Sequence, residues 1–157
     1  MEQLWAPWRI GYILREKEEG CFLCRKPQAA TDTVNHILIR DRTCFALLNA
    51  YPYNAGHLMV VPYKHTSELD DLTEQELADL MMLTRRCKNL LTQALKPDGF
   101  NVGINLGQAA GAGVSDHLHI HIVPRWNGDT NFMTVTGDVR VVPQALDAMY
   151  ATLLQHA

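Results

Sequence analysis

Three histidines occupy alternate positions in residues 117–123, at His117, His119 and His121. Successive side chains of an extended chain point to opposite faces, so this alternation predicts a strand. The three imidazoles would then lie on one face, about 6.5–7 Å apart, with the intervening apolar residues facing the core. A lone strand histidine is usually solvated or satisfied by a neighbour, but three in a row, in a chain with seven histidines, indicate a functional site.

These histidines allow three kinds of chemistry. Neutral imidazoles ligate metals, act as general acids or bases near pH 7, and attack electrophiles as nucleophiles. Residues 107–115, just upstream, are rich in glycine and alanine. Backbone N–H groups of such a segment can turn toward a phosphate, although a flexible hairpin connection has the same composition. Its position favours phosphorus chemistry, in which a histidine nitrogen forms a phosphoramidate and divides one displacement into two steps.

Length and charge limit the class of function. The 157 residues fit one domain with one core. The formal net charge of −3 lacks the basic footprint expected of a protein that binds nucleic-acid polymers or membrane surfaces, whereas a small anionic substrate needs only a local site. No segment has the length and hydropathy of a membrane span, and the first residues lack the pattern of a signal peptide. The expected compartment is therefore the cytoplasm.

Five β-rich runs predict the sheet that positions the histidines. Runs at 36–40, 44–49 and 57–62 are separated by turn residues and predict an antiparallel meander. The run at 100–105 predicts a fourth strand, and 117–123 predicts the fifth. We expect a five-stranded antiparallel sheet.

A long helix is expected to pack on this sheet. Thr73 and Glu76 form a capping-box sequence that opens an amphipathic run, which predicts one helix from about residue 74 to 95. Pro143 marks the expected first position of a C-terminal helix. The expected fold class is therefore α+β, and one domain is expected over 1–157. Its parts would be an N-terminal arm with the cysteine pair, a core, and a C-terminal loop and helix, at residues 1–34, 35–126 and 127–157.

The same residues carry a family resemblance. Residues 117–123 read His-φ-His-φ-His-φ-φ, where φ is apolar, and resemble the signature of the histidine triad (HIT) superfamily of nucleotide hydrolases and transferases. Residues 44–62 resemble the nucleotide-binding half of its fragile-histidine-triad branch, and the likeness covers residues 35–126. The opening Trp-Ala-Pro-Trp-Arg, together with Arg125 and Trp126, resembles bacterial relatives and dinucleoside tetraphosphate phosphorylases.

The resemblance implies cleavage at the α-phosphate of a dinucleoside polyphosphate or a related nucleoside phosphate ester. It implies that His119 is the nucleophile that accepts a nucleoside monophosphate. His121 and His57 would surround the phosphate, with His117 completing the catalytic group, and Asn49 would bind ribose. The implied phosphate-binding region comprises Asn105, Gly107, Gln108, Gly113 and Ser115.

One feature departs from the family pattern. Several members carry a hydroxyl or amide side chain, in the loop just before the triad, that touches the scissile phosphate. Here residues 112–114 are Ala-Gly-Val, and it stays open whether Ser115 takes that register. Leaving-group assistance and substrate choice are open for the same reason.

The pair Cys21-x-x-Cys24 predicts either metal ligands or a redox pair, because four cysteines are too few for a disulfide framework in this chain. In zinc-bearing relatives, including galactose phosphate uridylyltransferases, a histidine near the position of His65 joins the cysteine pair and the first triad histidine. The resemblance therefore implies a closed structural Zn²⁺ site at Cys21, Cys24, His65 and His117. The alternative is two reduced cysteines with a solvated His65.

Three hypotheses about function remain at this stage. The first is a nucleotidyl hydrolase or transferase with a nucleotide substrate and a covalent intermediate on His119. The second makes the triad a catalytic metal site, and the third is a nucleotide-binding scaffold with weak activity. The resemblance suggests a homodimer, which would also cover the aromatic segment at residues 4–13. No organic cofactor is expected, and the sequence leaves open the base, the number of phosphates and the acceptor.

Overall fold

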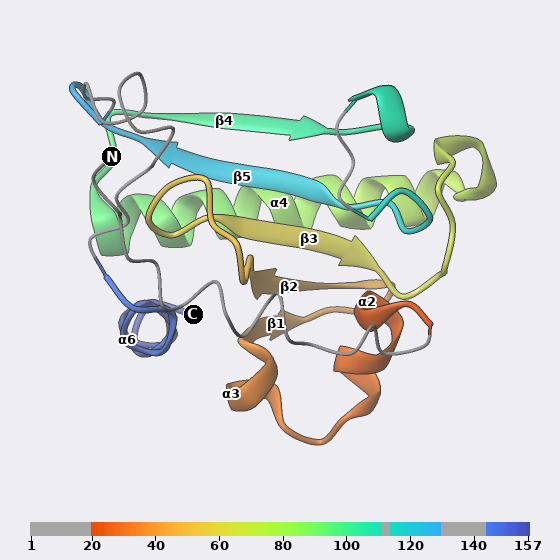
Figure 1. Cartoon of the computed structure of the whole chain (residues 1–157), viewed down its shortest axis with the longest axis horizontal. Coiled ribbons are helices and arrows are strands. Elements are labelled where there is room, and N and C mark those ends of the chain that lie inside the picture. Colours follow the sequence, from red (N-terminus) through yellow and green to blue (C-terminus); the bar gives the residue numbers. More distant parts are fainter. Residues whose placement is uncertain (1–19, 111–113, 130–143) are drawn as a thin grey trace, which may run out of the picture.

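The computed structural model describes residues 20–110, 114–129 and 144–157. Five strands form one antiparallel sheet in the order β1-β2-β3-β5-β4 (Figure 1). The predicted α+β fold and the meander of the first three strands are therefore confirmed. The strands are Ile37–Arg40 (β1), Cys44–Leu48 (β2), Leu58–Pro62 (β3), Gly99–Ile104 (β4) and Ile120–Arg125 (β5).

The long helix α4, Glu74–Leu95, has the predicted bounds. Its capping box is complete: the Thr73 hydroxyl accepts from the Glu76 N–H, and the Glu76 carboxylate accepts from the Thr73 N–H. The C-terminal helix α6 spans Leu146–Leu154, while Pro143, expected to open it, lies outside the described residues. The shorter helices are α2 (Phe22–Arg25), α3 (Asp32–Asn35), η2 (Lys26–Gln28), η3 (Leu69–Asp71) and η4 (Gln108–Ala110).

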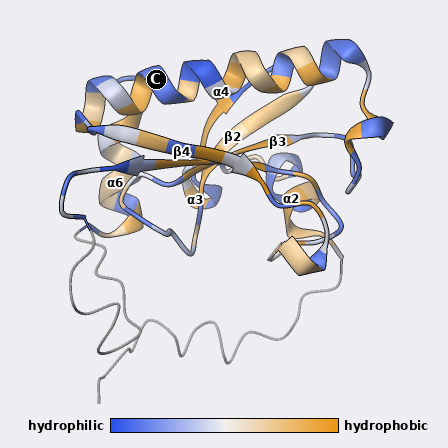
Figure 2. Cartoon of the chain, turned by 90° about the horizontal axis from the view of Figure 1, so that it is seen from above, coloured by the Kyte–Doolittle hydropathy of each residue, from blue (hydrophilic) through white to orange (hydrophobic). Residues whose placement is uncertain are grey.

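Both faces of the central strands are buried. Along β2, Ala46 and Leu48 face the core beneath α4, whereas Phe45 and Leu47 belong to a second apolar cluster on the opposite face. Leu23 of α2 is fully buried in this second cluster. Figure 2 accordingly shows α4 on one side of the sheet and α2 and α3 on the other. None of the helices in the described ranges is long and apolar enough to cross a membrane.

The fifth strand begins later than the alternation predicts. Regular pairing starts at Ile120, opposite Val60 of β3 and Ile104 of β4, and continues to Arg125. His117 and His119 therefore precede the strand, which corrects the predicted range 117–123. The predicted division of faces holds where the strand exists, because Ile120 and Ile122 join the core beneath α4 while His121 faces the opposite side.

Gly56 allows the turn that delivers the chain to His57, and this gives a test of the fold. Its φ is +72°, and an added Cβ would lie 2.5 Å from Leu95 Cδ1 and 3.2 Å from Leu91 Cδ2. Gly56→Ala is expected to lower the free energy of unfolding by about 2 kcal/mol through backbone strain and overpacking. Gly103→Ala is the matched control, because its Cβ would meet no atom within 4 Å. Equal denaturant midpoints for the two variants would contradict this account of the turn.

Candidate active site

Four buried histidines are candidates for the active site. His57 precedes β3, His117 and His119 precede β5, and His121 lies within β5. All four side chains are buried. The rings of His119 and His121 meet edge to face with centroids 4.7 Å apart, and the centroids of His57 and His121 are 5.0 Å apart. The structure thus brings together the imidazoles of His57, His119 and His121, whereas the ring of His117 lies against Cys21 and Cys24.

The loop before β3 sets the tautomers of His57 and His121. The Tyr53 N–H donates to His57 Nδ1 over 3.0 Å, so this nitrogen carries a lone pair and the proton resides on Nε2. His57 Nε2–H then donates to His121 Nδ1 over 2.9 Å. His121 consequently carries its own proton on Nε2, as an uncharged donor.

His119 has the opposite tautomer. Its Nδ1 lies 2.8 Å from the main-chain oxygen of His117, and a carbonyl can only accept, so Nδ1 carries the proton. The Nε2 atom of His119 is left with a bare lone pair. A neutral imidazole held in this way is a nitrogen nucleophile, because the reacting atom is deprotonated without any change of ionisation.

Burial keeps the two neighbouring imidazoles neutral. It lowers the pKa of His57 to about 3, with smaller contributions from charge on His121 and His119. Burial, with a smaller contribution from charge on His119, lowers the pKa of His121 to about 4. Both rings are therefore uncharged at pH 7, and they donate hydrogen bonds without offering a positive charge.

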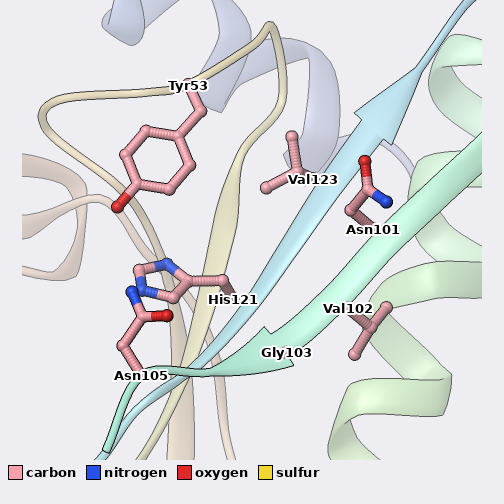
Figure 3. A pocket seen from close by; sticks show the side chains of 7 residues that line it. All are labelled: Tyr53, Asn101, Val102, Gly103, Asn105, His121 and Val123. Atoms are coloured by element: carbon pink, nitrogen blue, oxygen red, sulfur yellow. The ribbon is translucent and has the colours of Figure 1, made fainter. Parts of the chain in front are cut away.

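A cavity of about 200 Å³ adjoins His121, on the face of the sheet opposite α4 (Figure 3). Gly103 leaves room above β4, because no atom lies within 4 Å of the position that a Cβ would occupy. The groups that line the cavity are uncharged at pH 7, with amides as their main polar groups. The lining residues are Tyr53, Asn101, Val102, Gly103, Asn105, His121 and Val123.

Asn49, to which the resemblance gives a ribose contact, lies at the end of β2 beside His57. Its N–H donates to the His57 carbonyl over 2.9 Å, and its side-chain oxygen accepts from the Tyr51 N–H over 2.9 Å. Its Nδ2 lies 3.4 Å from His57 Nδ1. The side chain therefore takes part in fixing the loop that holds His57, and ribose binding stays a prediction.

The residues predicted to bind phosphate are spread over the loop after β4. Asn105 lines the cavity with His121. Gly107 has a φ of +78° and turns the chain into η4, which begins at the exposed Gln108. Ser115 is exposed in a turn, and Gly113 lies outside the described residues. Of this set, the structure brings Asn105 next to a triad histidine.

A second cluster consists of Cys21, Cys24, His65 and His117. One potential ligand atom from each residue lies within 4.8 Å of the other three. His117 Nδ1 is 3.2 Å from Cys21 Sγ and 3.4 Å from Cys24 Sγ, and His65 Nδ1 is 3.3 Å from both Cys24 Sγ and His117 Nδ1. The structure therefore brings together all four residues of the implied zinc set. In the part of the chain that the structure describes, no other group of three or more such residues converges in this way.

The donors of this cluster fit a tetrahedral ion. Zinc ligands at about 2.0–2.3 Å from the metal are separated from one another by about 3.3–3.8 Å, close to the distances found here. His117 Nε2–H donates to the Pro62 carbonyl over 2.9 Å, which leaves Nδ1 as a lone pair facing the thiols. His65 Nε2 lies 3.8 Å from an Asp116 carboxylate oxygen, on the side away from the ligand atoms.

Without a metal ion, the thiol of Cys24 is held in its protonated form. Burial, and then the neighbouring Cys21, raise the pKa of Cys24 to about 11. A metal ion would reverse this preference, because it binds the thiolate and releases the proton. The other three imidazoles offer no comparable set, because His119 Nε2 is their one unengaged lone pair: the Nδ1 atoms of His57 and His121 accept from the Tyr53 N–H and the His57 Nε2–H. The hypothesis of a catalytic metal on the triad is therefore disfavoured.

Several groups around the site escaped prediction from the sequence. Tyr53 looks like an ordinary turn residue, yet its N–H fixes the tautomer of His57 and its ring lies 4.5 Å from the His57 ring, centroid to centroid. The carbonyls of Pro62 and His117 orient the other two imidazoles, and main-chain groups leave no trace in residue identity. Asn101 and Val123 line the cavity, but in the sequence they are recognisable only as strand residues.

Comparisons with known proteins agree with this geometry. The model of the HIT domain family matches residues 30–128. A Mycobacterium tuberculosis protein named AP-4-A phosphorylase is 42% identical, and the alignment covers 93% of this chain and 79% of that protein. A Schizosaccharomyces pombe protein named bis(5'-nucleosyl)-tetraphosphatase (asymmetrical) is 33% identical, over 60% of this chain and 52% of that protein.

Among solved structures, a zinc-bound histidine triad family protein from Mycobacterium smegmatis superposes with a TM-score of 0.66 at 28% sequence identity. The superposition covers 87% of this chain and 94% of that one. The likeness therefore extends over most of both chains.

The lowered pKa values of His57 and His121 predict how stability depends on pH. Between about pH 6.5, where unfolded histidine titrates, and about pH 4, the unfolded chain binds more protons than the folded chain. Each buried neutral imidazole should therefore lower the free energy of unfolding by up to about 1.4 kcal/mol per pH unit as the pH falls through this window. His57→Gln should flatten the slope measured by urea denaturation between pH 7 and 5. His156→Gln, at the exposed C-terminus, is the control and should keep the wild-type slope; equal slopes for His57→Gln and wild type would contradict the assignment.

Proposed function

Because this chain belongs to the HIT domain family, we propose that it transfers a nucleoside monophosphate from a dinucleoside polyphosphate, or a related nucleoside phosphate ester, through an intermediate on His119. The observation that supports this most is the 2.8 Å contact between His119 Nδ1 and the His117 carbonyl, since it leaves Nε2 as a bare lone pair. The names of the two relatives support the substrate class.

The first step forms a bond between His119 Nε2 and the α-phosphorus. The bond from that phosphorus to the bridging oxygen breaks, and the electron pair leaves with the nucleoside oligophosphate. The ring gains positive charge as it attacks, and the His117 carbonyl on Nδ1–H stabilises that charge. We assign His121 Nε2–H as a hydrogen-bond donor to the phosphate oxygens, with His57 holding His121 in the required tautomer.

The second step returns His119 to its starting state. An acceptor oxygen attacks phosphorus, the phosphorus–nitrogen bond breaks, and its electron pair becomes the Nε2 lone pair again. Water as acceptor loses a proton to solvent and yields a nucleoside monophosphate, and the oxygen of an inorganic phosphate anion yields a nucleoside diphosphate. We propose phosphate as the preferred acceptor, because the relative named AP-4-A phosphorylase is similar over 93% of this chain.

The cavity beside His121 suits the departing part of the substrate. It has room above Gly103 and presents the uncharged amides of Asn101 and Asn105. We assign Asn105 to contact with the bridging or leaving phosphate and Asn49 to the ribose. Gly107, Gln108, Gly113 and Ser115 would complete the phosphate loop.

We also propose that Cys21, Cys24, His65 and His117 hold a structural Zn²⁺. Two thiolates and two imidazoles close a tetrahedral site, so the ion supplies a cross-link and no open position for substrate. The chain as a single domain, a homodimer and a cytoplasmic location remain parts of the same proposal. Two features support the dimer: β4 is an edge strand of the sheet, and its apolar residue Val102 is 48% exposed.

Replacement of the nucleophile tests the reaction directly. His119→Ala should lower kcat on a dinucleoside tetraphosphate by at least about a thousandfold, because no other imidazole can take its place: the Nδ1 atoms of His57 and His121 accept hydrogen bonds, and His117 Nδ1 faces the thiols. Affinity for a nucleoside monophosphate should change by only a few fold. His156→Ala is the matched control and should retain full turnover. Undiminished turnover in His119→Ala would refute the mechanism.

A product analysis identifies the acceptor. The protein is incubated with dinucleoside tri-, tetra- and pentaphosphates, with and without inorganic phosphate, and the products are separated by chromatography. Release of a nucleoside diphosphate that contains phosphorus from labelled inorganic phosphate is expected, with little product when phosphate is omitted. Monophosphate release at the same rate in both conditions would replace the phosphorylase proposal with a hydrolase.

A further inference from the structure

The peptide that joins His117 to Leu118 lies outside the regular sheet. Pairing of β5 with its neighbours begins at Ile120, so the ladder does not hold this peptide. Its N–H donates to the Thr66 carbonyl over 2.7 Å, and its C=O accepts from His119 Nδ1 over 2.8 Å. The orientation of this one peptide therefore decides which tautomer His119 adopts.

The side chain of His117 provides the remaining restraints. Its Nε2–H is bound to the Pro62 carbonyl, and its Nδ1 lies among the ligand atoms of Cys21, Cys24 and His65. His65 directly precedes Thr66, which is the residue that accepts from the Leu118 N–H. The segments 65–66 and 117–118 are thus joined twice, once by a hydrogen bond and once through the ligand cluster. Figure 1 shows α2, which begins directly after Cys21, beside the end of β3.

We propose that the ion bound by this cluster positions the nucleophile, because it holds the His117 carbonyl in the orientation that keeps the proton of His119 on Nδ1. This inference rests on the proposed metal site and goes beyond a structural cross-link. His117 is then a positioning residue with two separate contacts: its ring binds the ion, and its carbonyl binds His119. The reactive atom Nε2 needs no contact with the ion.

The physical reason is that a hydrogen bond to one end of an imidazole selects the tautomer. Without an ion, the four donors have no common partner, and the two thiols and two imidazoles can separate. The ring of His117 then keeps only the Pro62 carbonyl as a restraint, and its peptide keeps only the bond from the Leu118 N–H to the Thr66 carbonyl. Because His65 is no longer tied to His117, segment 65–66 can move away, break this bond and let the peptide rotate. His119 would exchange between its two tautomers, and in one of them Nε2 carries the proton and cannot attack.

Coupling of this kind is reciprocal, so it can be measured without turnover. If the ion favours the contact between His117 and His119, the contact must favour the ion by the same factor. Typical couplings between two sites change affinity by 5- to 150-fold, and we expect about tenfold here. An ion that only ties α2 to the sheet would show no such dependence on His119.

The first experiment observes the tautomer. The full chain is labelled with ¹⁵N-histidine, and the ring nitrogens of His119 are recorded by long-range ¹H–¹⁵N NMR in the zinc-loaded and the chelated protein. The loaded protein should show one tautomer with the proton on Nδ1, and the chelated protein a mixture. An unchanged His119 spectrum in a chelated chain that keeps its fold would overturn the proposal.

The second experiment holds even if the chelated chain unfolds. Zinc affinity is measured by competition with a chelator for wild type, His119→Ala, His119→Asn and His121→Ala. The Ala substitution of His119 should weaken zinc about tenfold, whereas Asn, whose side-chain NH₂ can replace Nδ1–H, should restore most of the affinity. His121→Ala removes a neighbouring ring that makes no bond to residue 117 and should leave zinc affinity unchanged.

The outcomes separate this proposal from the proposed reaction, because neither experiment uses a nucleotide. Wild-type zinc affinity in His119→Ala overturns the coupling and leaves the reaction untouched. Equal losses in His119→Ala, His119→Asn and His121→Ala also overturn it, because they would show a general loosening of the site. Failure of the wild-type chain to bind one zinc per chain by mass spectrometry would remove the metal site and overturn this proposal with it.

Discussion

One hydrogen bond, from His119 Nδ1–H to the main-chain oxygen of His117, is the interaction on which the proposed reaction depends. A neutral histidine has two tautomers, and the carbonyl makes the unprotonated Nε2 the persistent state. The surrounding fold positions the four histidines of the site. The ladder of β5 orients His121, the turn at Gly56 presents His57, and the ligand cluster holds the ring of His117. Three histidines at alternate sequence positions thereby become imidazoles with different partners, two of them before β5 and one within it.

The site is built from neutral donors, although its proposed substrate is strongly anionic. Burial holds the pKa of His57 near 3 and that of His121 near 4, and uncharged groups line the cavity beside them. Neutral N–H groups bind phosphate oxygens without the desolvation penalty of a buried cation. A bound phosphate would also raise the pKa of both imidazoles toward neutrality, since an adjacent negative charge favours the protonated ring.

Much of this arrangement could be predicted from the sequence because it follows from local patterns. The alternation of apolar residues, the capping box at Thr73 and the turn residues predicted the antiparallel sheet and the bounds of α4. The start of β5 was predicted three residues too early, because alternation continues through His117 and His119 where pairing has ceased. The second apolar cluster beneath Leu23 was missed, since a Cys-x-x-Cys segment gives no sign that the residue inside it is buried.

The candidate site was predictable as a list of residues but not as a network. The spacing of the histidines marked His119 and His121, and the resemblance implied the set that includes His57 and His65. Main-chain partners such as the Tyr53 N–H and the Pro62 carbonyl depend on the path of loops far apart in sequence. Because these partners set the tautomer of each imidazole, the tautomers could be assigned only from the three-dimensional structure.

The central claim is that Nε2 of His119 takes the nucleotide, and trapping the intermediate tests it most directly. The wild-type protein would be mixed with a dinucleoside tetraphosphate in the absence of inorganic phosphate and quenched within milliseconds in alkaline denaturant. It would then be digested and analysed by mass spectrometry. The account predicts a nucleoside monophosphate bound to the peptide that contains residue 119, with fragmentation placing it on His119, and its loss when phosphate is added before the quench. An adduct on His57 or His121, or turnover with no adduct on any residue, would contradict the claim.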